Sequence, residues 1–94
     1  MHRSLTHKAS SDFWLCYNQL PAPIKKQADR AFGHLKQNPR HPALHFERLK
    51  GNNSIWSARV NDDYRALAAN RDDTFVWFWI GSHAEYDSLV ARLA

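Results

Sequence analysis

The spacing of apolar residues changes along the chain, and this change constrains the fold more than any other feature of the sequence. In the first forty or so residues apolar side chains recur every three or four positions, as in Ile24, Ala28, Phe32 and Leu35, which is the period of an amphipathic helix. From Leu44 onward they recur at every second position, which is the period of a β-strand. A chain that is helical first and strand-forming afterwards is expected to fold into an α+β domain.

Two helices are predicted in the first part of the chain. Ser10 or Ser11 can cap a helix that continues to about residue 20, where Pro21 and Pro23 interrupt it. Pro23 also suits the first turn of a second helix, which ends at Asn38 because the next residue is a proline. Since the connection between them is short, we expect the two helices to form an antiparallel hairpin.

Four strands and a short closing helix are predicted in the second part. The strands cover residues 45–49, 55–60, 64–70 and 74–80, and Gly, Asn, Asp and Ser occupy the turns of an antiparallel meander. The last strand is apolar on both faces, which predicts a central position or a cover on both sides. Ser82 and Glu85 form a capping box at the start of a helix that runs to about Arg92. Residues 1–9 either add a strand or stay loose.

Together these elements predict an α+β fold in a single domain over residues 1–94. An N-terminal helix hairpin packs on one face of a four-stranded antiparallel sheet, and a short C-terminal helix follows. The side chains expected to be mostly buried are Phe13, Trp14, Tyr17, Ile24, Ala28, Phe32, Leu35, Leu67, Val76 and Phe78. The pattern leaves open which face of the last strand meets the helices.

Composition excludes several classes of protein. Hydrophobic residues make up 44% of the chain, with only 3 Gly and 4 Pro, which excludes a disordered or collagen-like chain. The longest apolar run covers residues 75–80, whereas a membrane-spanning helix needs roughly 20 residues, and no apolar leader follows Met1. Cys16 is the only cysteine, which fits a reducing compartment. We therefore expect a cytoplasmic protein that has no membrane partner.

Positive charge is concentrated in the first half of the chain. The formal net charge is +4, and residues 1–50 hold nine lysines and arginines against three acids. Residues 51–94 hold four arginines against six acids. A basic half favours a polyanionic partner such as nucleic acid, although a solvated basic helix would give the same count.

The sequence predicts neither a metal site nor a cofactor. His41 and His45 are four residues apart, but Pro42 between them prevents a shared helix face, and Cys16 has no second cysteine. Glycine-rich phosphate loops and a nucleophile elbow are absent.

A pair of arginines flanks the turn of the hairpin over residues 56–67. If residues 61–63 form the turn, Arg59 and Arg65 face each other, and like charges repel there unless an anion or an acid lies between them. If the turn has only two residues, the two arginines point to opposite faces. Alternatively, both arginines simply pair with Asp62, Asp63 or Glu47.

His83 lies in the first turn of the predicted closing helix, directly after Gly81 and Ser82. A neutral imidazole can act there as a general base. Tyr86, three residues on, shares a helix face with His83. The alternative is a surface histidine that hydrogen-bonds the helix cap.

Four short phrases in this order resemble a known family. They are Leu20-Pro21, then Asn38-Pro39-Arg40-His41-Pro42-Ala43-Leu44, then Arg59-Val60 followed by Asp63-Tyr64-Arg65-Ala66, and then Ile80-Gly81-Ser82-His83-Ala84-Glu85-Tyr86-Asp87. Over about residues 12–90 the chain resembles the RelE/ParE superfamily of bacterial type II toxin–antitoxin toxins. This superfamily contains both ribosome-dependent mRNA endonucleases and gyrase poisons.

The resemblance implies roles for three residues. In the RelE-like branch the arginine of a Tyr-Arg pair lies in the RNA groove, which corresponds to Arg65. In the branch closest to YafQ a Gly-x-His stretch supplies a histidine for proton transfer, which corresponds to His83. Tyr86 is the nearest match to the aromatic residue that stacks near the cut. We expect these three residues to be catalytic.

The resemblance also implies an RNA-binding or phosphate-binding set. A histidine and an aspartate flank the hairpin turn in the branch closest to YafQ, and Arg59 and Asp63 stand at the matching positions. Lys50 and Arg48 lie near the place of RelE's lysine-rich strand, which is otherwise missing, and Tyr64 precedes Arg65.

The chemistry of RNA cleavage gives these residue types a purpose. Without a metal, the 2′-hydroxyl attacks the adjacent phosphate, and the reaction needs a base, a cation for the phosphate and an acid for the leaving 5′-oxygen. Arg65, helped by Arg59, holds the phosphate, while His83 transfers a proton. Tyr86 or Tyr64 stacks on a base or orients the phosphate.

The expected function is that of a type II toxin, a ribosome-dependent, metal-independent mRNA endoribonuclease. The alternatives are a ParE-like toxin that inhibits DNA gyrase and an inactive toxin-fold binding module. The implied partners are a cognate antitoxin, the ribosome and mRNA, or DNA gyrase in the alternative. No cofactor is implied.

Overall fold

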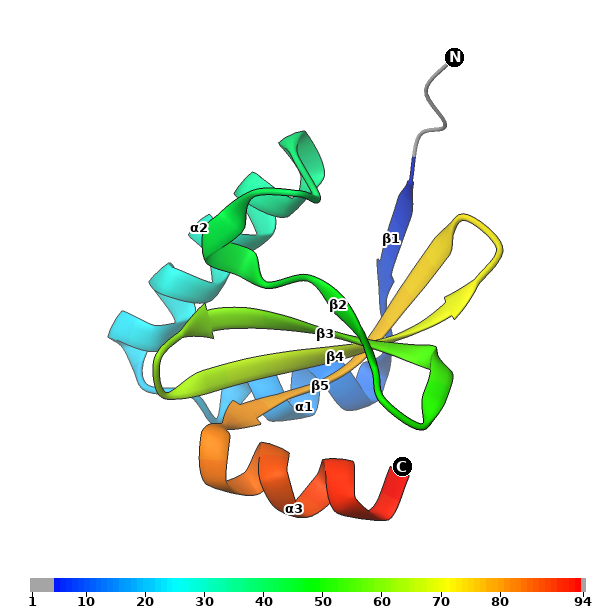
Figure 1. Cartoon of the computed structure of the whole chain (residues 1–94). Coiled ribbons are helices and arrows are strands. Elements are labelled where there is room, and N and C mark those ends of the chain that lie inside the picture. The colour runs from blue at the N-terminus through cyan, green and yellow to red at the C-terminus, as the bar shows by residue number, and fades with distance from the viewer. Residues whose placement is uncertain (1–4, 94) are drawn as a thin grey trace.

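The structure is a computed structural model that describes residues 5–93, and it contains three α-helices, one short 3₁₀ segment and five strands in that range. In chain order the elements are β1 (Thr6–Ala9), α1 (Ser11–Asn18), α2 (Ala22–Gln37), the 3₁₀ segment η1 (Pro42–Leu44), β2 (Glu47–Leu49), β3 (Asn52–Asn61), β4 (Tyr64–Arg71), β5 (Thr74–Ser82) and α3 (His83–Leu93), as Figure 1 shows. No helix in the described part of the chain is long and apolar enough to cross a membrane.

The α+β class is confirmed, but the sheet is mixed and has five strands in the order β1-β5-β4-β3-β2. The antiparallel strands β2–β5 follow the expected meander. The additional strand β1 pairs in parallel with β5, and Thr6 lies opposite Thr74. The expectation of four antiparallel strands was therefore wrong, because a four-residue segment without apolar alternation pairs with a strand almost seventy residues away. Of the open alternatives for residues 1–9, Thr6–Ala9 takes the strand, and residues 1–4 lie outside the described residues.

The first two helices pack on different parts of the sheet and do not form the expected antiparallel hairpin. Helix α1 packs on β5, α2 packs on β3, and the two helices barely contact each other. Ser10 is the N-cap of α1 and accepts a hydrogen bond from the Phe13 amide at 3.3 Å. The main link between the helices is a 2.8 Å hydrogen bond from the Tyr17 hydroxyl to Asp29, which raises the pKa of the Tyr17 phenol. The start of α1 is held on β5, since the Ser10 amide donates a 2.9 Å hydrogen bond to the Trp77 carbonyl.

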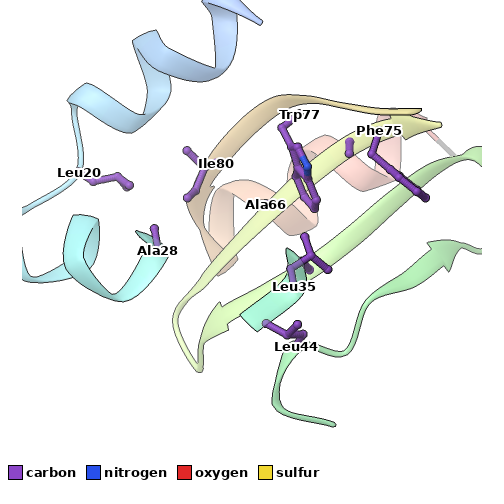
Figure 2. Close-up of a cluster of buried hydrophobic side chains, with 10 residues drawn as sticks. Leu20, Ala28, Leu35, Leu44, Ala66, Phe75, Trp77 and Ile80 are labelled. Carbon is purple, nitrogen blue, oxygen red and sulfur yellow. The ribbon is translucent and has the colours of Figure 1, made fainter. Parts of the chain in front are cut away.

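The core lies between the helices and one face of the sheet (Figure 2). It consists of Leu20, Ala28, Leu35, Leu44, Ala58, Ala66, Ala68, Phe75, Trp77 and Ile80. Leu67 is fully buried but points to the opposite face, because side chains alternate along a strand and its neighbours Ala66 and Ala68 face the core. Helix α3 contacts β4 and β5 and covers that opposite face.

Several side chains expected in the core are not there. Ala28, Leu35 and Leu67 are buried as expected, whereas Phe13, Tyr17, Ile24, Val76 and Phe78 are only half-buried. Trp14 is 49% exposed and Phe32 is 38% exposed. Both border a hollow of about 260 Å³ between α1 and α2, which stays open because the helices do not close on each other. We expected Val76 and Phe78 of β5 in the core, but the residues that alternate with them, Phe75 and Trp77, are the ones that lie there.

Replacing Leu35 by alanine is expected to lower the free energy of unfolding by about 2–5 kcal/mol, because its side chain is 2% exposed and its removal leaves a cavity. The matched substitution Phe32→Ala is expected to have a smaller effect, since that ring is partly solvated already. Urea unfolding curves of both variants measure the difference. An equal loss of stability in the two variants would contradict the burial described here.

His7 attaches β1 to the core. Its Nδ1 accepts a hydrogen bond of 3.1 Å from the Trp77 indole, and its ring stacks on Phe75 and meets the edge of Phe32. Burial, and secondarily the charge of Lys36 on α2, lower the pKa of His7 below its usual value of 6.5. The folded chain therefore holds this imidazole neutral, as its role as an acceptor requires.

This lowered pKa makes stability depend on pH. The unfolded chain binds a proton at His7 near pH 6.5, whereas the folded chain binds it only at lower pH. The stability that neutral His7 contributes is therefore complete above pH 6.5 and is lost as the pH falls through the lowered pKa. Denaturation midpoints of wild type and His7→Phe between pH 5 and 8 test this expectation, because the two proteins share all other histidines. Parallel curves would contradict it.

Candidate functional site

The turn between β3 and β4 places two arginines side by side. Asp62 and Asp63 form a two-residue turn, and Asn61 lies opposite Tyr64. A bulge at Val60 then shifts the register so that Arg59 lies opposite Arg65. From the sequence, we expected Arg59 and Arg65 to face each other only if the turn had three residues. In the structure they face each other because a two-residue turn is followed by a bulge.

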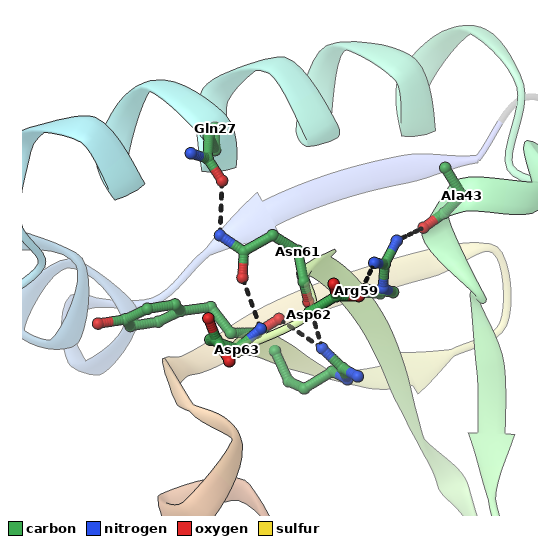
Figure 3. Close-up of polar contacts among 8 residues, drawn as sticks. Gln27, Ala43, Arg59, Asn61, Asp62 and Asp63 are labelled. Carbon is green, nitrogen blue, oxygen red and sulfur yellow. Dashed lines mark hydrogen bonds and ion pairs between the residues drawn. The ribbon is translucent and has the colours of Figure 1, made fainter.

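Nearby acceptors hold both guanidinium groups in place, and Figure 3 shows those of Arg59. Arg59 forms an ion pair with Asp62 and donates a 3.3 Å hydrogen bond to the Ala43 carbonyl. The bond from Arg59 also lowers the pKa of the Asp62 carboxyl. Arg65 uses one nitrogen, Nη1, to donate to the carbonyls of Asn61 and Tyr64, the latter at 3.0 Å. In residues 5–93 no hydrogen bond engages the other guanidinium nitrogens of Arg65, which leaves them available for an anion.

The same turn is bonded to two helices. Asn61 donates to the Gln27 side chain of α2 and accepts a 2.8 Å hydrogen bond from the Asp63 amide (Figure 3). The Asp63 carbonyl accepts a 2.7 Å hydrogen bond from the amide of His83, the first residue of α3. These bonds fix the arginine pair relative to the start of α3.

The predicted capping box starts α3. The Ser82 amide donates to Glu85 Oε1, and the Glu85 amide donates to Ser82 Oγ, both at 3.2 Å. Gly81 precedes the box because a Cβ there would lie 2.6 Å from the ring of Trp79. Glycine therefore allows the backbone to pass this indole closely rather than to turn sharply, since β5 continues to Ser82.

His83 and Tyr86 lie side by side on α3. Their ring centroids are 5.9 Å apart, and the Tyr86 ring lies 6.4 Å from that of Trp79. The His83 side chain is 48% exposed, and its Nε2 lies 3.4 Å from a carboxylate oxygen of Asp87. This histidine therefore interacts with the next turn of its own helix rather than with the helix cap.

A cleft of about 360 Å³ lies between α3 and the strands β2, β3 and β4. It brings together five of the eight predicted site residues: Arg48, Lys50, Arg59, Arg65 and Tyr86. Among the three others, His83 lies beside Tyr86 but does not line the cleft, and Tyr64 and Asp63 lie at the nearby turn. The eight predicted site residues therefore lie near one another, but only five of them line the cleft.

Three further polar residues line the cleft that the sequence analysis did not assign to it, namely His45, Glu47 and Ser57. The period of two contains a signal for Glu47, which shares a strand face with Leu49, whereas His45 precedes β2 and has a left-handed backbone. The cleft walls then carry four cationic side chains and one carboxylate, which suits an anionic ligand such as a phosphodiester. Among the described side chains no three of the metal-binding types gather in one place.

Helices α1 and α2 lie on one face of the sheet, and the basic cleft lies beside α3 on the other. The ParE-like toxin domain model matches residues 22–88. The chain therefore belongs to the ParE-like toxin domain family. No curated protein sequence matches the chain.

Solved structures share this fold at low sequence identity. YafQ from E. coli strain BL21(DE3) is 15% identical, with a TM-score of 0.69 over 87% of this chain and 97% of that chain. A chain of the RelB–RelE antitoxin–toxin complex from Methanococcus jannaschii is also 15% identical, with a TM-score of 0.69 over 87% and 96%. The isolated E. coli RelE toxin is 14% identical, with a TM-score of 0.63 over 96% and 99%. At these identities the likeness establishes the fold alone.

Proposed function

We propose that the chain is a toxin that cleaves mRNA on the ribosome without a metal ion. The observation that carries this proposal is the cleft, in which Arg65 and three other cationic side chains surround a space beside Tyr86. A ribosomal target implies that the toxin acts in the cytoplasm.

The cleft supplies the groups that this reaction needs. The 2′-hydroxyl of the RNA loses a proton and attacks the adjacent phosphorus, the bond to the 5′-oxygen breaks, and that oxygen gains a proton. Negative charge develops on the phosphate oxygens in the transition state, where fixed cationic donors stabilise it. The guanidinium nitrogens of Arg65 that make no hydrogen bond donate to the phosphate oxygens, and Arg59 on the opposite strand adds a second positive charge.

Two residues of α3 complete the proposed site. His83 transfers a proton at the rim of the cleft, where the carboxylate of Asp87 orients its ring. Tyr86 lines the cleft, contacts the rings of His83 and Trp79, and positions the RNA by stacking on a base. Arg48 and Lys50 on β2 and the following turn bind the phosphate backbone of the RNA. Tyr64 and Asp63 support the site from the turn.

A cognate antitoxin is the proposed protein partner. Structures of the same fold include the RelB–RelE complex and the DinJ–YafQ toxin–antitoxin complex from E. coli. An acidic segment would complement the four cationic side chains of the cleft and would block access by RNA.

Inhibition of DNA gyrase is the second candidate function, because the matching family model is the ParE-like one. Such a toxin acts by binding a protein and needs no proton transfer. In that case His83 and its neighbour Asp87 serve only as surface residues of α3.

Expression of the wild-type chain without its antitoxin is expected to arrest growth and to produce new 5′ ends in cellular mRNA. Primer extension on mRNA from the arrested culture measures these ends, and coexpression of the neighbouring gene in the operon is the control. Growth arrest with intact mRNA and accumulated gyrase–DNA breaks would replace the nuclease by the gyrase function. If the folded chain neither arrests growth nor cuts mRNA, the remaining explanation is an inactive binding module.

A further inference from the structure

Asn61, the last residue of β3, makes hydrogen bonds to three different parts of the molecule (Figure 3). Its main-chain carbonyl accepts from Nη1 of Arg65, whose side chain lines the cleft. Its side-chain oxygen accepts a 2.8 Å hydrogen bond from the Asp63 amide within the turn. Its side-chain nitrogen donates to Oε1 of Gln27 on α2. One residue therefore connects the arginine of the cleft with a helix.

Gln27 and the cleft lie on opposite sides of the sheet. Helix α2 packs on β3 at the core face, whereas the cleft lies beside α3 on the other face. Ala28, the residue after Gln27, is buried in the core, so this turn of α2 is held firmly against the sheet. Gln27 does not line the cleft, and any effect of its side chain on RNA cleavage has to pass through the turn.

The guanidinium of Arg65 depends on Asn61 for its orientation. In residues 5–93 its hydrogen bonds both come from Nη1, one to the Asn61 carbonyl and one to the Tyr64 carbonyl. Asn61 follows the bulge at Val60, where the ladder between β3 and β4 is interrupted. Strand pairing constrains the backbone less at such a place, so the two side-chain bonds of Asn61 decide where its carbonyl points.

We propose that Asn61 and Gln27 are positioning residues for Arg65, an inference that rests on the proposed nuclease function. Gln27 fixes the side chain of Asn61, and the carbonyl of Asn61 fixes Nη1 of Arg65. The remaining guanidinium nitrogens are thereby aimed at the scissile phosphate. A donor fixed in this way stabilises transition-state charge better than a mobile one, because it does not have to reorient during the reaction. Helix α2 thus acts on the cleft from the opposite face of the sheet.

The first test is Gln27→Met, which keeps the length of the side chain but lacks the acceptor. Its single-turnover rate on saturating programmed ribosomes that carry a synthetic mRNA is expected to fall about tenfold, because small misplacements of a reacting group have effects of this order. Its affinity for these ribosomes is expected to stay within about twofold of wild type, since the lost contact acts in the transition state. Gln37→Met, the same change at the exposed end of α2, is the matched control and should alter neither quantity.

A double-mutant cycle with Arg65→Ala separates positioning from a general loss of structure. If Gln27 acts through the guanidinium, Gln27→Met has almost no further effect on the rate once Arg65 is alanine. A substitution that merely unfolds part of the protein lowers the rate by the same factor in both backgrounds. Asn61→Ala removes both side-chain bonds and is expected to give the same pattern with a larger loss of rate.

A spectroscopic measurement tests the same inference without RNA. In nitrogen NMR spectra of the free chain, the Nη signals of Arg65 are identified by their absence in Arg65→Ala. They are expected to show slow rotation of the guanidinium in wild type and faster rotation in Gln27→Met, because the carbonyl that holds Nη1 is released.

Three outcomes would overturn the positioning role. They are an unchanged cleavage rate in Gln27→Met, an equal loss of rate in both backgrounds, and identical guanidinium rotation in wild type and Gln27→Met. Absence of cleavage by wild type would instead refute the proposed nuclease function, and the rotation of the Arg65 guanidinium would then decide the positioning role alone.

Discussion

Replacing Arg65 by alanine is expected to lower the rate of mRNA cleavage by about 10²–10³-fold, the usual effect of removing one group that stabilises transition-state charge. One nitrogen of Arg65 is fixed by two carbonyls of its own hairpin, so the remaining donors are already oriented before RNA binds. Arg65→Lys is expected to restore only part of the rate, because an ammonium lacks the planar fork of a guanidinium. Single-turnover rates on programmed ribosomes measure both effects.

Arg71→Ala is the matched control for this experiment. Arg71 lies at the other end of β4, is exposed and does not line the cleft. Its removal lowers the net charge equally, so the two variants separate a local contact from general electrostatic attraction. Equal losses in Arg65→Ala and Arg71→Ala would contradict a phosphate contact by Arg65.

Replacing His83 by alanine is expected to lower cleavage by about 10²–10⁴-fold, because a proton-transfer group is removed. Folding should be unaffected, since the side chain is half-exposed and the capping box of Ser82 and Glu85 keeps the start of α3. Asp87→Asn is expected to have a smaller effect, as it only releases the orientation of the imidazole. Single-turnover rates of the two variants on programmed ribosomes measure the difference.

If His83→Ala retains full activity on mRNA while Arg65→Ala does not, the proposal that His83 transfers a proton is wrong. If all variants arrest growth equally and leave mRNA intact, the nuclease proposal fails for the whole site. The gyrase function then becomes the leading explanation, and purified gyrase in a cleavage assay tests it directly.

The parts of the fold that depend on local sequence could be predicted. The meander from β2 to β5 follows from the period of two and from turn residues, and the start of α3 follows from the spacing of Ser82 and Glu85. The facing of Arg59 and Arg65 was one of two alternatives, and the bulge at Val60 decided it.

The parts that depend on distant contacts could not be predicted. Nothing in Thr6–Ala9 indicates its partner β5, because parallel pairing is specified by tertiary contacts such as the bond between His7 and Trp77. The exposure of Trp14 and Phe32 follows from the separation of α1 and α2, which a helical stripe does not encode. His45 joins the cleft through its left-handed backbone, a conformation that the side-chain pattern does not reveal.

The order of strands in the sheet has a consequence for solubility of the free toxin. The long, strongly apolar strand β5 lies between β4 and β1, so the backbone of its first four residues, 74–77, is paired on both sides. The edges of the sheet are instead the four-residue β1 and the three-residue β2, which carry Lys8, Glu47 and Arg48. Short, charged edge strands oppose the addition of a strand from another molecule. Without β1, a nine-residue apolar strand would become an edge, and the free chain would be prone to aggregate through it.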